Sequence, residues 1–120
     1  MATNEAYGQY LAEELPVKRA NLQAWKELLR SLSVGIHVAK KQLEYSKSLK
    51  ENHESMCDKK DPATLKELAE YDPAIEEDKA CIVRLEKEKA GVITEMSNLM
   101  VELQTMEADA AELGIKVLEE

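Results

Sequence analysis

The apolar residues in the last third of the chain follow a heptad spacing. Between Ile82 and Val117 one set of positions recurs at alternating intervals of three and four residues, and all but Lys89 are apolar: Ile82, Leu85, Lys89, Val92, Met96, Leu99, Leu103, Met106, Ala110, Leu113 and Val117. This spacing places the side chains on one face of a helix. It predicts a long helix that begins at Asp72-Pro73, runs to about Leu118 and packs along its length against other helices.

A second long helix is predicted over residues 17–56. Its apolar positions repeat the same spacing: Leu22, Trp25, Leu29, Leu32, Ile36, Ala39 and Leu43. After Leu43 this frame meets Ser46 and Lys50, while the apolar character moves to Tyr45, Leu49, His53 and Met56. We interpret the shift as a stutter, a local change of supercoil that transfers the packed seam to the second set of residues.

The segment at residues 57–73 is predicted to reverse the chain. Asp61-Pro62 has the form of a helix cap followed by proline at the first helical position, and it starts a short helix through Leu65, Leu68 and Ala69. Folding the long helices about this segment gives an antiparallel helical hairpin over residues 17–120. Gly35 and Gly91 then fall at similar levels, which indicates either close approach of the two backbones or chance.

Charge favours this antiparallel pairing. Residues 17–50 contain eight Lys or Arg and two Glu, whereas residues 90–120 contain one Lys and seven Asp or Glu. A basic helix attracts an acidic one and repels a parallel copy of itself. Because each surface pair contributes only about 0–1 kcal/mol, charge selects the orientation and the apolar seam supplies the stability.

The N-terminal residues 1–16 are predicted to form a separate short amphipathic helix or arm. Asn4 can cap it, and the apolar or aromatic residues of one side are Tyr7, Tyr10, Leu11 and Leu15. Pro16 disfavours helix at Leu15 and suits the first turn of a new helix. The arm either folds back onto the hairpin or docks on a partner protein.

Some apolar residues lie beside the seam. Ile93 and Met100 widen the apolar face of the last helix, and Leu28 does the same on the first. One antiparallel partner covers only a narrow stripe, so the fold class is predicted as all-α, a hairpin completed to a three- or four-helix bundle. The extra helix comes from residues 4–15 or from another chain. The predicted protein interface consists of Tyr7, Tyr10, Leu11, Leu28, Ile93 and Met100.

Composition narrows the class of protein. The chain has 120 residues, 33% of them charged and 4% aromatic, with a net charge of −8. This charge argues against direct binding of nucleic acid. No apolar run approaches the roughly 20 residues of a membrane span, and the N-terminus lacks the basic and apolar segments of a signal peptide. The two cysteines are expected as reduced thiols, so a cytoplasmic or nuclear location is predicted.

Chemistry-bearing motifs are missing from the sequence. It contains no phosphate-binding glycine loop, no nucleophile elbow and no H-E-x-x-H. His53, Cys57 and Cys81 could gather at one end of the hairpin, with Asp58 or Asp78 as a fourth zinc ligand, but the spacing lacks a C-x-x-C pair. Partly buried thiols are the preferred interpretation. We therefore expect no catalytic residues, no cofactor, no metal, no small-molecule substrate and no enzymatic activity.

Two resemblances cover parts of the pattern. The order of helices, with Asp61-Pro62-Ala63-Thr64-Leu65-Lys66 at the turn, resembles the small tubulin-folding cofactor A bundles, although this chain has an extra N-terminal segment. Ala24-Trp25-Lys26, followed by Leu32, Ile36, Ala39, Lys41 and Leu43, is similar to a coiled-coil stretch in a small spliceosomal subunit of the breast-carcinoma-amplified-sequence type. The second covers about twenty residues, mostly seam positions shared by any coiled coil. We assign the chain to neither family.

The sequence thus favours a function carried by helix packing. We expect a structural or adaptor coiled-coil subunit that contacts a protein partner, or further copies of itself, within a larger helical assembly. The alternative is a small helical-bundle chaperone, of the kind that the first resemblance implies, holding a protein client on an acidic surface.

Overall fold

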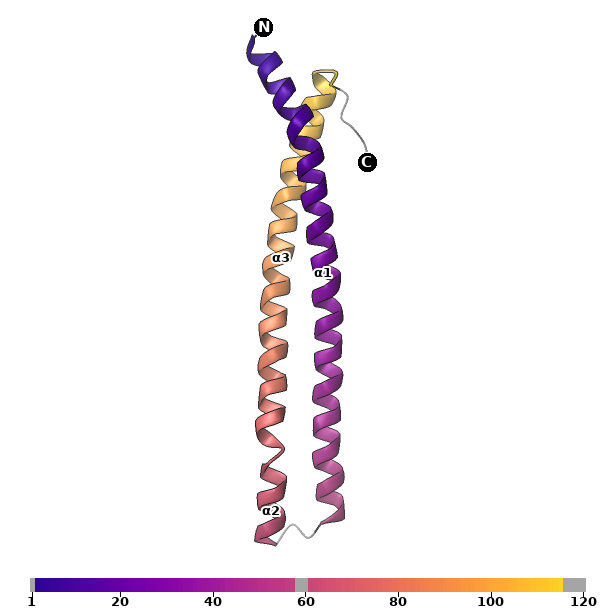
Figure 1. Cartoon of the computed structure of the whole chain (residues 1–120), viewed down its shortest axis with the longest axis vertical. Helices are drawn as coiled ribbons and strands as arrows, with labels where there is room; N and C mark the ends of the chain where they lie inside the picture. Colours follow the sequence, from indigo (N-terminus) through magenta and orange to yellow (C-terminus); the bar gives the residue numbers. More distant parts are fainter. Residues whose placement is uncertain (1, 58–60, 116–120) are drawn as a thin grey trace. The chain divides into compact units, whose positions relative to one another are not determined.

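The chain folds into three helices in the computed structural model, which describes residues 2–57 and 61–115 (Figure 1). They are α1 (Ala2–Met56), α2 (Pro62–Ala69) and α3 (Asp72–Glu112). No strand occurs among these residues, so the prediction of an all-α fold is confirmed. The expectations for Asp58 and for the helix around Val117 fall outside the described residues.

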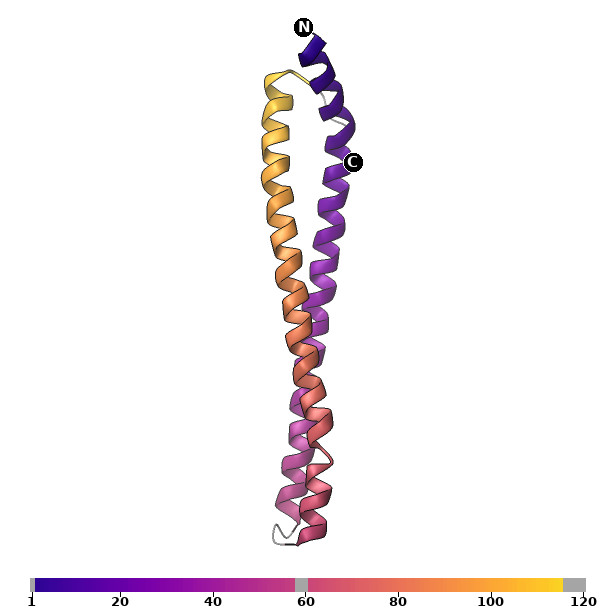
Figure 2. The same ribbon diagram turned by 90° about the vertical axis from the view of Figure 1, so that its left-hand side faces the viewer.

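The helices contribute to two compact units. The first, here called the terminal unit, comprises residues 1–30 and 90–120, and the second, the turn unit, comprises residues 31–89. Within the terminal unit, the yellow end of α3 runs beside the indigo start of α1 (Figures 1 and 2). Within the turn unit, Lys40 pairs with Glu86 and Lys50 with Asp72, which fixes an antiparallel register. Antiparallel pairing of α1 with α3 is therefore confirmed inside each unit, whereas completion to a three- or four-helix bundle is not shown.

The core of the terminal unit uses the predicted heptad positions of α3. Leu103, Met106 and Ala110 are buried against Leu11 and Leu15 of α1, and further partly buried side chains pack on this cluster: Leu22, Leu99 and Ile115. The seam predicted over residues 82–117 is thus confirmed as far as Ala110. Leu113 is exposed instead, because α3 ends at Glu112.

A glycine stops α3 before the predicted end near Leu118. Gly114 has φ of 69°, its N–H donates to the carbonyl of Ala111 and the N–H of Ile115 donates to that of Ala110. These two bonds form a Schellman motif, which satisfies the last carbonyls of a helix. Ile115 then folds back toward α1, where a Cβ on Gly8 would lie 2.9 Å from its Cδ1 atom. A glycine at position 8 leaves the space that this packing needs.

The predicted break at Pro16 is wrong. Pro16 lies inside α1, whose ribbon bends in its indigo part without interruption (Figure 1). An interior proline costs about 3 kcal/mol of helix stability. Leu11 and Leu15, both 0% exposed, each gain about 1.5–3 kcal/mol from burial, and a continuous helix holds both against α3. Their combined gain offsets the cost of the proline, so residues 2–16 are the first turns of α1 rather than a separate arm.

The turn unit confirms the predicted short helix. The Asp61 carboxylate accepts a hydrogen bond from the N–H of Ala63, and Pro62 occupies the first turn of α2. Thr64 and Leu68 are the buried residues of α2, and Ile75 is buried in the first turns of α3.

The glycines do not mark a close approach of backbones. In the turn unit, a Cβ on Gly35 would make an ordinary 3.8 Å contact with Leu85. In the terminal unit, a Cβ on Gly91 would meet nothing within 4 Å. The interpretation of these glycines as points of close backbone contact is therefore wrong.

Candidate protein-interaction surfaces

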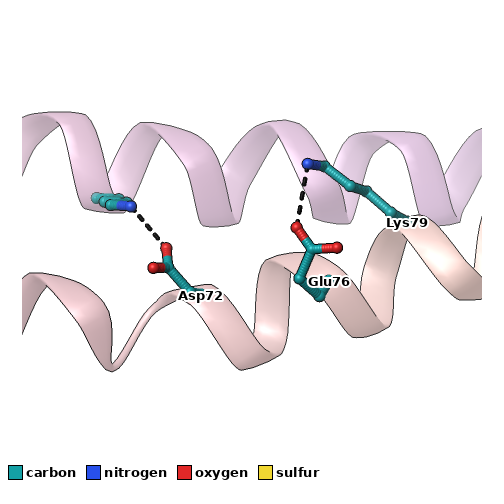
Figure 3. A network of polar contacts seen from close by, with 4 residues as sticks. Asp72, Glu76 and Lys79 are labelled. Atoms are coloured by element: carbon teal, nitrogen blue, oxygen red, sulfur yellow. Dashed lines mark hydrogen bonds and ion pairs between the residues drawn. The ribbon is translucent and has the colours of Figure 1, made fainter.

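The stutter predicted after Leu43 does not occur. Ser46 is buried and donates a hydrogen bond to Asp78 at 3.0 Å, and Lys50 donates to Asp72 at 2.6 Å. Next along α1, the Nδ1 atom of His53 lies 2.9 Å from the Tyr71 hydroxyl. The seam keeps its original frame because each polar side chain in it finds a polar partner from the returning chain. Figure 3 shows Asp72 reaching toward α1, beside the ion pair of Glu76 with Lys79.

The unchanged frame leaves a second apolar face on α1. Three of the residues predicted to enter the seam, Tyr45, Leu49 and Met56, remain on the surface, and they continue a line begun by two valines. We call this set the outer stripe: Val34, Val38, Tyr45, Leu49 and Met56, which are 62, 59, 60, 39 and 86% exposed. With about 100° of rotation per residue, these five positions fall within about 60° of one another around the helix. The turn unit therefore presents one apolar line to solvent while it packs another.

Of the six residues predicted as a protein interface, one is buried and five are exposed. Leu11 is fully buried in the core of the terminal unit, where it packs on residues of its own chain. Tyr7 and Tyr10 are partly exposed and stack with ring centroids 6.2 Å apart. Leu28 is 43% exposed, and Ile93 and Met100 are each 45% exposed.

The N-terminal turns of α1 pack on their own chain. Leu11 and Leu15 cover Leu103, Met106 and Ala110, and the Tyr7 hydroxyl donates a hydrogen bond to the Asp109 carboxylate. That hydrogen bond, with the negative charge beside it, raises the pKa of Tyr7 above its ordinary value. The first of the two alternatives for residues 4–15, packing in cis, is therefore the observed one. It does not cover Ile93 and Met100.

Ion pairs join α1 to α3 with the polarity that the charge pattern predicts. In the terminal unit Lys18 pairs with Glu102 at 2.7 Å and Arg19 with Glu107 at 3.1 Å. The turn unit adds the Lys40–Glu86 and Lys50–Asp72 pairs, so α1 supplies the cation in all four. The hydrogen bond from Lys18 to Glu102 raises the pKa of Lys18, and the bond to Asp72 does the same for Lys50.

Reversing the charges of these pairs tests the antiparallel register. We expect K18E/R19E to lower the free energy of unfolding by about 1–2 kcal/mol, because two attractions become repulsions. The matched control is K26E/R30E, with the same charge change on the same helix at residues for which the described chain shows no ion pair. Urea denaturation at low salt measures both variants, and equal losses would contradict the pairing.

His53 and Cys81, two of the candidate metal ligands, are engaged in other contacts. The Nε2 atom of His53 lies 3.3 Å from Glu67, and the Cys81 sulfur accepts a long hydrogen bond from Arg84. Asp58 lies outside the described residues. Among the residues that are described, no group of three or more His, Cys, Asp or Glu side chains could hold a metal ion. In that part of the chain, no helix is long and apolar enough to cross a membrane.

The candidate functional surfaces thus lie outside the packed seam. One contains Leu28, Ile93 and Met100 in the terminal unit, and the other is the outer stripe of the turn unit. The sequence already indicates Leu28, Ile93 and Met100. The sequence also shows the apolar residues of the outer stripe, but their spacing fits a buried seam as well as an exposed face. Comparison with known proteins finds no matching protein family, no matching curated protein and no matching solved structure.

Proposed function

We propose that the chain is a structural or adaptor subunit that acts through protein–protein contacts within a larger helical assembly. The observation that carries the proposal is the exposure of Ile93 and Met100 beside a finished core. Each keeps 45% of its surface in solvent, although the neighbouring Val92 is only 6% exposed. Val101 on the same helix is more exposed still.

A helical partner suits this surface. Ile93 and Met100 are seven residues apart, so they lie on one line along α3, about a quarter turn from the seam. A helix packed along that line would bury both side chains and complete the α1–α3 pair to a three- or four-helix bundle. Full burial of such a side chain contributes about 1.5–3 kcal/mol relative to exposure, and part of that gain is still available here.

The chaperone alternative has less support. A client held on an acidic surface needs free carboxylates, but three of those on the last turns of α3 already contact α1. Glu102 pairs with Lys18, Glu107 pairs with Arg19 and Asp109 accepts from Tyr7.

The double variant I93D/M100D tests the proposal. The chain is purified from its native source, and the mass of its complex is measured by sedimentation. We expect the wild type to sediment with its partner in fixed stoichiometry, and the double variant to lose the partner while its helix content stays unchanged. V83D is the control, since Val83 is another exposed apolar residue of α3 in the turn unit.

Two outcomes would contradict the proposal. One is a wild-type chain that sediments alone from its native source at every concentration. The other is a complex that survives I93D/M100D intact.

A further inference from the structure

Four of the five residues of the outer stripe have a spacing that is the same in both directions. Val38, Tyr45, Leu49 and Met56 are separated by seven, four and seven residues. Two copies of this segment can therefore be laid antiparallel, centred near residue 47, with Val38 of one copy against Met56 of the other and Tyr45 against Leu49. Each of these four side chains then meets an apolar side chain, while position 60, opposite Val34, lies outside the described residues.

From this match we propose that the outer stripe of the turn unit binds the outer stripe of a second copy of the chain, with the two α1 helices antiparallel. The proposal rests on the proposed function, because it names one partner of a protein that acts by helix packing. The surface is distinct from Ile93 and Met100, which belong to the terminal unit.

Charge selects the antiparallel orientation. Lys41 lies on the margin of the stripe, within about 60° of its centre, and is exposed. A parallel pair in register would set Lys41 against Lys41, and like charges facing each other across a helix pair destabilise it. The antiparallel pair sets Lys41 level with His53, one residue from Asn52 and within one turn of Glu51 of the second copy. The polar positions then meet polar positions of compatible charge, as the apolar positions meet apolar ones.

The alternative occupant is the chain itself. Rotating α1 by about a third of a turn would bring Tyr45 and Leu49 toward α3. That rotation would break the contacts of Ser46 with Asp78, Lys50 with Asp72 and His53 with Tyr71. A net loss of about 0.5–1.5 kcal/mol for the neutral contact of His53 with Tyr71, and more for each of the two contacts to carboxylates, opposes the rotation. A second copy covers the stripe without breaking any of them.

Sedimentation of the purified chain at a series of concentrations tests the dimer. We expect the wild type to approach twice the 13.5 kDa of one chain, and V38D/L49D to remain monomeric with a dissociation constant raised at least 100-fold. Circular dichroism should show unchanged helix content in the variant, because both replaced side chains are exposed.

The variant I93D/M100D separates this proposal from the proposed function. It should dimerise as the wild type does, because its substitutions lie in the other unit, while it loses the heterologous partner. A wild type that stays monomeric, or a V38D/L49D variant that still dimerises, would overturn the self-association and leave the adaptor function standing.

Disulfide trapping tests the orientation. In a C57S/C81S background, K41C and N52C chains are prepared separately, mixed and oxidised. The antiparallel pair predicts a cross-link between the two different chains, and little within either preparation alone, because two thiols at position 41 would lie roughly 18 Å apart along the axis. Cross-linking of K41C with itself would show a parallel pair and overturn the geometry. The V38D/L49D measurement does not depend on this background.

Discussion

Replacing Leu15 with alanine is expected to lower the free energy of unfolding by about 2–5 kcal/mol, the range for truncating a fully buried leucine. Leu15 is 0% exposed and packs in the cluster with Leu11, Leu103, Met106 and Ala110. The loss combines the transfer free energy of the removed atoms with the cavity left between α1 and α3. Urea denaturation followed by circular dichroism measures it as a shift of the midpoint at an unchanged slope.

The matched control is Leu28→Ala, the same substitution on the same helix and in the same unit. Leu28 is 43% exposed, so its loss should stay below about 1 kcal/mol. Equal losses for the two variants would mean that the first turns of α1 do not pack on α3. A loss of 2–5 kcal/mol is a large part of the 5–15 kcal/mol that stabilises a typical domain, so the L15A midpoint should fall well below that of L28A.

The seam of α3 could be predicted from the sequence because its signal is local and redundant. From Ile82 to Ala110 the spacing repeats without a break, and the only polar residue in it, Lys89, has a stem long enough to reach water. The cap of α2 at Asp61-Pro62 is equally local, since the side chain bonds a backbone N–H two residues away. The opposite charges of the two long helices then indicate which way they pair.

The polar half of the seam in the turn unit could not be predicted in the same way. Apolar character marks a seam only where its partners are apolar, and the partners of Ser46 and Lys50 are Asp78 and Asp72, which lie 32 and 22 residues away. Nothing near Ser46 in the sequence indicates that a carboxylate will meet it. The stutter rule therefore assigned Tyr45 and Leu49 to the inside, whereas tertiary contacts place them outside.

Local sequence patterns and tertiary contacts together also determine which of the predicted interface residues are exposed. Exposure of Ile93, Met100 and Leu28 follows from their position beside a seam that is itself complete, and this could be predicted. Burial of Leu11 could not be predicted. The rule that a proline disfavours helix at the preceding residue considers only neighbouring residues, and it predicts a separate arm at residues 1–16. The cluster that buries Leu11 is formed by residues about ninety positions later in the chain.

Pro16→Ala is expected to raise the free energy of unfolding by about 2 kcal/mol. Pro16 lies inside α1, so it has no N–H for the carbonyl of Ala12, and its ring crowds that carbonyl. Removing both defects recovers most of the roughly 3 kcal/mol that an interior proline costs. Alanine also makes the unfolded chain more flexible, which reduces the gain in stability by about 0.4–1 kcal/mol.

The sign of this effect discriminates between a continuous helix and two helices that meet at the proline. Where a proline begins a new helix, its missing N–H is not needed and its fixed φ is favourable, so alanine there would leave stability unchanged or lower it. The neighbouring substitution Val17→Ala is the control, because Val17 is exposed and gains only up to about 0.7 kcal/mol of helix propensity. Urea denaturation of P16A, V17A and the wild type measures all three. A P16A midpoint at or below that of the wild type would contradict a single helix from Ala2 to Met56, and with it the packing that buries Leu11 and Leu15.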